Sequence, residues 1–136
     1  MKLNVYLTFN GQCEEAFKFY EECLGGKIGE MLRYEGTPMT EDVPAEWHNK
    51  IMHASINVGD SVLMASDAPP QYQEEAKGFS VALHVNDAAE AERFFAALSE
   101  NGTVQMPMEE TFWAARFGML VDKFGTPWMI NCDKPA

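Results

Sequence analysis

His84 and Arg116 are the side chains whose types and surroundings best suit catalysis. His84 lies in the alternating stretch 81–85, between apolar residues. An imidazole in such a stretch titrates near neutral pH and can act as a general acid, a general base or a hydrogen-bond donor. Arg116 lies between Ala115 and Phe117 in an otherwise apolar stretch, where a guanidinium needs a carboxylate or an anionic ligand. We predict that His84 and Arg116 would carry out any catalysis.

Both residues also have a structural interpretation, which the sequence leaves open. His84 could be bonded to a neighbouring strand. Arg116 could form a salt bridge with one of three carboxylates close to it in the sequence, Glu109, Glu110 or Asp122.

A second set of side chains is predicted to bind a ligand. In a strand, alternate residues point to opposite faces, and the apolar positions are expected to pack beneath the helices. The polar, methionine and aromatic positions then line the other face, as in a typical small-molecule site. These residues are Tyr6, Thr8, His53, Met64, Ser66, Ser80, Trp113 and Met129. The alternative is that dimer packing or the sheet's own side chains close this face.

The elements that carry these residues form an internal repeat. The first copy is predicted as a strand over 2–9, a helix over 12–24 and strands over 27–35, 51–58 and 61–67. The second has strands over 79–85, 103–108, 114–121 and 126–132, with a helix begun by a capping box of Asp87 and Glu90. The repeated order is βαβββ, in modules of about 1–67 and 79–136 joined by a 68–78 linker. The long segment 36–50 is predicted to be a loop.

Composition limits the class of protein. The chain has 136 residues, enough for one domain with a core, and a net charge of −11. That charge argues against a nucleic-acid partner, which needs clustered basic residues. No apolar run reaches the length of a membrane span and no signal peptide is evident, so we expect no membrane partner and a cytoplasmic location. Three cysteines without metal or redox spacing are expected to be free thiols.

The repeat and its motifs resemble the vicinal oxygen chelate superfamily, which includes glyoxalase I, extradiol dioxygenases and bleomycin-binding proteins. The resemblance is greatest to the PhnB-like proteins. It is carried by residues 6–11, 52–54, 63–67, 110–114 and 122–132. It implies an α+β fold in which two tandem βαβββ modules form a curled, cup-like mixed sheet, and it implies a homodimer.

Metal-dependent members of this superfamily take four ligands from the first and last strands of the two modules. The matching positions in this sequence are Asn4, Met64, Ser80 and Met129. Thioethers suit copper(I) better than the divalent ions used in the superfamily, and an amide and a hydroxyl add little. We therefore predict no metal and no other cofactor. A metal bound by His53, His84 and a carboxylate is the alternative.

The predicted function is that of a small-molecule-binding, PhnB-like protein that lacks the usual divalent-metal ligands. Whether it is also an enzyme is left open, and the sequence does not name a substrate. One alternative is ligand sequestration like that of the bleomycin-binding proteins, since strong acidity suits a cationic drug. The other is a metal-dependent isomerase, lyase or thiol transferase with displaced ligands.

Overall fold

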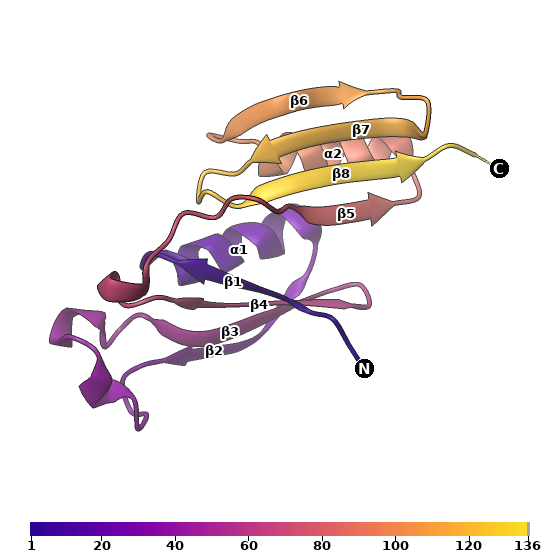
Figure 1. The fold of residues 1–136 in the computed structure, drawn as a ribbon. Coiled ribbons are helices and arrows are strands. Elements are labelled where there is room, and N and C mark those ends of the chain that lie inside the picture. The colour runs from indigo at the N-terminus through magenta and orange to yellow at the C-terminus, as the bar shows by residue number, and fades with distance from the viewer. Residues whose placement is uncertain (136) are drawn as a thin grey trace. The chain divides into compact units, whose positions relative to one another are not determined.

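The computed structural model describes residues 1–135 as two compact units. The first unit is Met1–Glu74 and the second begins at Glu75, so the division falls within the segment 68–78. In each unit a strand and a helix are followed by three further strands (Figure 1). The predicted fold class, two tandem βαβββ modules, is therefore confirmed.

The first unit is a four-stranded mixed sheet with one helix. Its strands lie in the order β1-β4-β3-β2, in which β1 is parallel to β4 and the other neighbours are antiparallel. The elements are β1 (Val5–Phe9), α1 (Cys13–Leu24), β2 (Lys27–Arg33), β3 (Ile51–Val58) and β4 (Ser61–Asp67).

Helix α1 packs on one face of this sheet through a stripe of apolar residues. Ala16, Phe17 and Tyr20 are fully buried, and their spacing of three to four residues places them on one side of the helix. The ring of Phe9 meets the ring of Phe17 edge-on, at a centroid distance of 6.4 Å. The helix ends at Gly25, whose φ of 69° is a left-handed conformation that glycine adopts without strain.

The segment predicted as a loop over 36–50 is more ordered than expected. It contains two short 3-10 helices, η1 (Thr40–Asp42) and η2 (Ala45–Trp47). Trp47 and Val43 pack with Tyr34 in a small apolar cluster of their own. A third 3-10 helix, η3 (Pro70–Tyr72), follows β4.

The second unit repeats the same plan. Its strands lie in the order β5-β8-β7-β6, again with a parallel outer pair, β5 and β8. Ala91, Phe94, Phe95 and Leu98 form the buried stripe of its helix. The elements are β5 (Val81–Val85), α2 (Ala88–Leu98), β6 (Thr103–Glu109), β7 (Ala114–Val121) and β8 (Pro127–Asp133).

A buried aspartate ties segments together in each unit. The Asp67 carboxylate accepts hydrogen bonds from the backbone N–H groups of Gly11, Cys13 and Ile51 at 2.9–3.0 Å. In the second unit, Asp122 accepts one from the indole N–H of Trp128 at 2.8 Å. Because buried carboxylates need such partners, these two residues fix the ends of the strands beside them.

None of the helices within residues 1–135 is both long enough and apolar enough to cross a lipid bilayer.

Candidate functional site

The face of each sheet opposite its helix, here called the helix-free face, carries most of the predicted site residues. In β4 the buried residues Leu63 and Ala65 alternate with Met64 and Ser66, which are half-buried. Residues paired across neighbouring strands share a face, and the pairs of this face are Tyr6 with Met64, Thr8 with Ser66 and Ser55 with Met64. Tyr6, Thr8, Met64 and Ser66 therefore lie together on the helix-free face of the first unit, as predicted by alternation.

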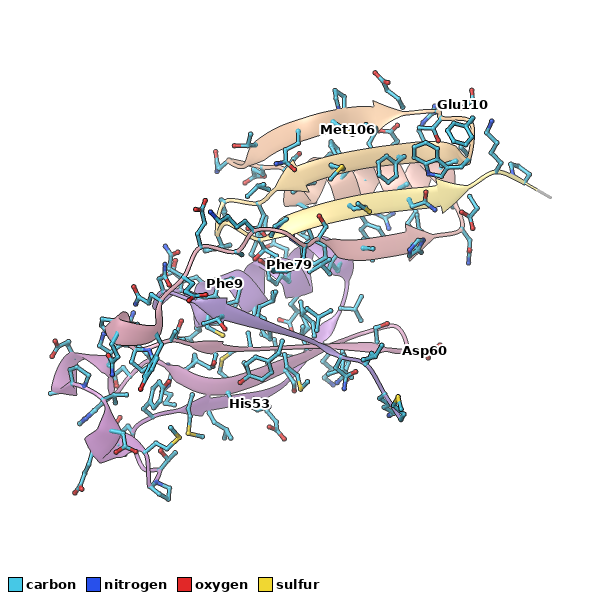
Figure 2. All side chains as sticks on the ribbon, in the orientation of Figure 1. Phe9, His53, Asp60, Phe79, Met106 and Glu110 are labelled. Atoms are coloured by element: carbon cyan, nitrogen blue, oxygen red, sulfur yellow. The ribbon has the colours of Figure 1, made fainter. Side chains whose placement is uncertain are left out.

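His53 joins this group through Tyr6. It lies on β3 (Figure 2), next to Leu32 of β2. The Tyr6 hydroxyl is 3.2 Å from His53 Nδ1, and the two rings are stacked with centroids 5.8 Å apart. On its other side, His53 Nε2 is 3.6 Å from a carboxylate oxygen of Glu30. His53 of β3 therefore contacts the phenol of Tyr6 from β1 and the carboxylate of Glu30 from β2.

In the second unit, Gly118 identifies the two faces. A side chain at Gly118 would collide with the Phe95 ring of α2, so Gly118 faces the helix and its neighbours Phe117 and Met119 face away. Strand pairing then places Met129 beside Met119, and Asn131 beside Phe117.

The parallel pairing of β5 with β8 adds His84 to the same face, opposite Asn131. The Asn131 amide nitrogen is 3.4 Å from His84 Nδ1 and 2.9 Å from a carboxylate oxygen of Asp133. Asn131 is buried, whereas His84 and Asp133 are exposed. The helix-free face of the second unit therefore holds an imidazole hydrogen-bonded among methionine and aromatic side chains.

Two more predicted ligand-binding residues lie close to these strands. Trp113 precedes β7, and 47% of its side chain is exposed. Its indole meets the Phe117 ring edge-on at 5.3 Å, which extends the apolar surface of the helix-free face. Ser80 is half-buried and immediately precedes β5.

Arg116 lies on the other face of its sheet, which is covered by α2. Its Nε donates a hydrogen bond to Glu92 of α2 at 3.0 Å. Strand alternation turns Arg116 towards the helix, so its ion-pair partner is Glu92, which the sequence did not suggest. The structure therefore does not bring Arg116 together with His84. A catalytic role for Arg116 stays a prediction, and the bond to Glu92 favours a structural one.

Several residues of the helix-free faces were not predicted from the sequence. Glu30, Asn131 and Asp133 contact the two histidines, and Phe117 contacts Trp113. Alternation from Met129 would have placed Asn131 on the correct face. Nothing in the sequence indicates that β2 lies beside β3 in the register that brings Glu30 to His53.

A hollow of about 180 Å³ lies in the first unit near the start of α1. Its two basic side chains are already engaged. Arg33 binds both carboxylate oxygens of Glu14 at 3.0–3.1 Å, and Lys50 donates to the carbonyl of Gly11 at 2.9 Å. The Arg33 guanidinium holds the pKa of the Glu14 carboxyl below its usual value. This hollow contains none of the predicted site residues, and its lining has more carboxylates than basic side chains.

The residues at the superfamily's metal positions do not fit a divalent ion. Asn4 and Ser80 lie just before β1 and β5, and Met64 and Met129 are strand residues. An amide, a hydroxyl and two thioethers are a poor donor set for the harder ions that carboxylate and imidazole ligands hold. Within residues 1–135, no three His, Cys, Asp or Glu side chains are grouped so that they could bind a metal.

Comparisons with known proteins agree with the fold. The family model described as Glyoxalase/Bleomycin resistance protein/Dioxygenase superfamily matches residues 2–130. The chain is 35% identical to protein YjdN of Escherichia coli K12, over 98% of this chain and 97% of YjdN. It is 50% identical to protein PA1353 of Pseudomonas aeruginosa, whose crystal structure superimposes with a TM-score of 0.90 over 99% of both chains.

The PhnB protein of Bacillus cereus, described as a putative 3-demethylubiquinone-9 3-methyltransferase, has the same fold. Its TM-score is 0.79 at 22% identity, over 97% of this chain and 99% of that one. The matched family model and the YjdN relationship together cover nearly the whole sequence. The chain therefore belongs to the glyoxalase/bleomycin resistance protein/dioxygenase superfamily.

Proposed function

We propose that this protein binds a small molecule on its helix-free faces, through the imidazoles of His53 and His84. One observation carries the proposal. Each face holds a histidine whose Nδ1 is hydrogen-bonded, by Tyr6 in one unit and by Asn131 in the other. The oriented imidazoles lie beside methionine and aromatic surface, the combination of a few polar groups in apolar surroundings that is typical of ligand sites.

The methionines support the proposal. Met64 lies beside Tyr6 in the first unit, and Met119 and Met129 are paired in the second. Methionine side chains are flexible and polarisable, so they adapt to ligands of irregular shape. If the bound molecule is also transformed, the imidazoles of His53 and His84 are the groups on these faces proposed to act on it.

No step of this proposal passes through a metal, because the donors at the superfamily's metal positions do not suit one. If the protein is instead a metal-dependent isomerase, lyase or thiol transferase, it should contain a well-occupied divalent ion. Elemental analysis of protein purified without an affinity tag distinguishes the two.

We also propose that the protein is a cytoplasmic homodimer. The family resemblance supports the dimer, and so does Phe112, whose side chain is 90% exposed and available for burial against a second copy. Light scattering should give twice the 15.3 kDa mass of the chain. A single-chain mass at micromolar concentration would contradict the dimer.

A thermal-shift screen tests ligand binding. A molecule that binds only the native state raises its Tm, so bleomycin and a panel of anionic, neutral and cationic metabolites are suitable probes.

Hits are then titrated by calorimetry against His53→Ala and His84→Ala. We expect at least one variant to bind a hit ten-fold or more weakly than the native protein, a loss of about 1.4 kcal/mol. The matched control is His48→Ala, which removes the histidine of the 36–50 segment and should leave affinity unchanged. Equal affinity in all three variants would contradict the proposed site.

Ligand sequestration is the second candidate function, and the net charge of −11 favours it for a cationic ligand. An acidic protein attracts cations over distances that salt shortens, so raising the salt concentration should weaken such binding. Stoichiometric binding with the ligand recovered unchanged after prolonged incubation supports sequestration. Appearance of a product contradicts it.

A further inference from the structure

We propose that Asn131 and Asp133 are positioning residues that hold neutral His84 with its proton on Nε2. His84 then offers a hydrogen-bond donor to an acceptor oxygen of the ligand, such as a carbonyl or carboxylate oxygen. The ligand part of this inference rests on the proposed function, whereas the part about the proton stands on the protein alone.

Asp133 fixes the orientation of the Asn131 amide. An ionised carboxylate only accepts hydrogen bonds, so the amide group 2.9 Å from Asp133 must be the NH₂ group and not the carbonyl. The two residues are two positions apart on β8 and therefore lie on the same face. Asn131 is 93% buried by the strands around it, with a relative exposure of 7%, which restricts the amide to this position.

The oriented amide in turn determines which nitrogen of His84 carries the proton. The same NH₂ group lies 3.4 Å from His84 Nδ1, and it has a second hydrogen to donate. A neutral imidazole has one nitrogen that donates and one that accepts. Because Nδ1 faces a donor, it carries the lone pair, and the proton is on Nε2.

With its proton on Nε2, His84 can donate a hydrogen bond to a ligand. His84 is exposed on its strand, and within residues 1–135 no hydrogen-bond partner occupies Nε2. This N–H group is therefore available to a ligand on the helix-free face, which also carries Met129 and Phe117. The sequence leaves His84 open as an acid, a base or a donor. The arrangement around Nδ1 selects the donor.

The position of the proton can be measured without a ligand. The full-length protein is labelled with ¹⁵N in its histidines, and imidazole spectra are recorded at pH 8, above the ordinary histidine pKa of about 6.5. We expect a protonated Nε2 signal and an unprotonated Nδ1 signal for His84.

Two variants make the test decisive. Asn131→Asp places an acceptor beside Nδ1, so the Nδ1 signal should move to the protonated position. Asp133→Ala removes the acceptor that orients Asn131, so the amide can turn over and the two His84 nitrogen signals should move towards one another. The exposed turn variant Asp60→Asn is the matched control and should leave His84 unchanged. His53 serves as an internal reference and should not change in any of the three proteins.

Two results would overturn the inference. One is a proton on Nδ1 in the native protein, and the other is an Asp133→Ala spectrum that matches the native one. Asp133 is exposed, so this variant still gives an answer if Asn131→Asp does not fold. A failure to find any ligand would count against the proposed function and would leave the spectra unaffected.

Discussion

At the scale of single residues, the buried Asp67 carboxylate holds three backbone segments of the first unit together. It joins the start of β3, the start of α1 and Gly11 through three N–H groups. The Tyr34 hydroxyl adds a fourth contact by donating to the Asp67 carbonyl at 2.8 Å. Burial raises the pKa of Tyr34, so this hydroxyl stays protonated and remains a donor at neutral pH.

We predict that Asp67→Asn destabilises the protein by about 1–3 kcal/mol, the cost of leaving a buried backbone donor unpaired. The amide turns an N–H group towards at least one N–H group that the carboxylate had accepted. Urea denaturation followed by tryptophan fluorescence measures the change. Asp60→Asn, in the exposed turn between β3 and β4, should cost less than about 0.5 kcal/mol. Equal effects of the two substitutions would contradict the role assigned to Asp67.

The thiols of Cys13 and Cys23 should differ in reactivity. Burial, the Asp67 carboxylate and the Glu14 carboxylate all raise the pKa of Cys13, so its thiol stays neutral at pH 8. Because the thiolate is the reactive form, we predict that iodoacetamide labels the half-buried Cys23 long before Cys13. Peptide mass spectrometry measures the order. The difference should disappear in about 8 M urea, where the protein is unfolded. If Cys13 of the native protein reacted as fast as Cys23, the prediction would be wrong.

At the scale of elements, the pair formed by Glu14 and Arg33 ties α1 to β2. Arg33 lowers the pKa of Glu14 through two hydrogen bonds, so the carboxylate is favoured in the folded state. A carboxyl whose pKa is lower in the folded than in the unfolded state stabilises the fold above its unfolded value of 4.5. This contribution is lost as the pH falls through the folded value.

Glu14→Gln should therefore be less stable than the native protein at pH 7, and the difference should shrink below pH 4.5. Both side chains are more than a third exposed, so the difference should be no more than about 1 kcal/mol. Urea denaturation across this pH range measures it. Glu15→Gln, one residue along the same helix, is the matched control, because it leaves the ion pair of Glu14 and Arg33 in place. A Glu14→Gln difference that persists unchanged at low pH would contradict the ion pair.

Local sequence patterns predicted the elements well and their contacts poorly. Alternation set β3 and β4 at the residues where the structure has them, because one face of each strand is buried. The 3-10 turns of the 36–50 segment were not predicted, because they depend on the packing of Trp47 with Tyr34. No periodic pattern in the sequence indicates that contact. The capping box is not formed, because the Asp87 side chain makes no hydrogen bond at the start of α2.

The candidate site shows the same division. Faces follow from alternation, which is why Tyr6, Met64 and His84 lie on the faces that alternation predicted. Partners follow from strand register and from helix-to-sheet packing, which a single sequence does not give. Glu92, which binds Arg116, was missed for this reason.

At the scale of the whole molecule, duplication gives two sheets, each with one face covered by the helix of its unit and one helix-free face. The order of elements is identical in the two units, and so is the parallel pairing of the first strand with the last. The side chains are not identical. One face has a phenol and an imidazole, and the other has an imidazole and an amide, so the two faces offer different groups to a ligand.

The central claim is that ligands lie on the helix-free faces, and methionine methyl groups test it most directly. Met64, Met119 and Met129 belong to these faces, whereas Met108 lies against the helix side of Gly118 and Met31 is paired with the buried Ala54. Spectra of ¹³C-methyl methionine are recorded while a thermal-shift hit is added. The account predicts that signals of the first three residues move and that those of Met31 and Met108 stay in place. Saturable binding that moves only Met31 and Met108 would contradict it.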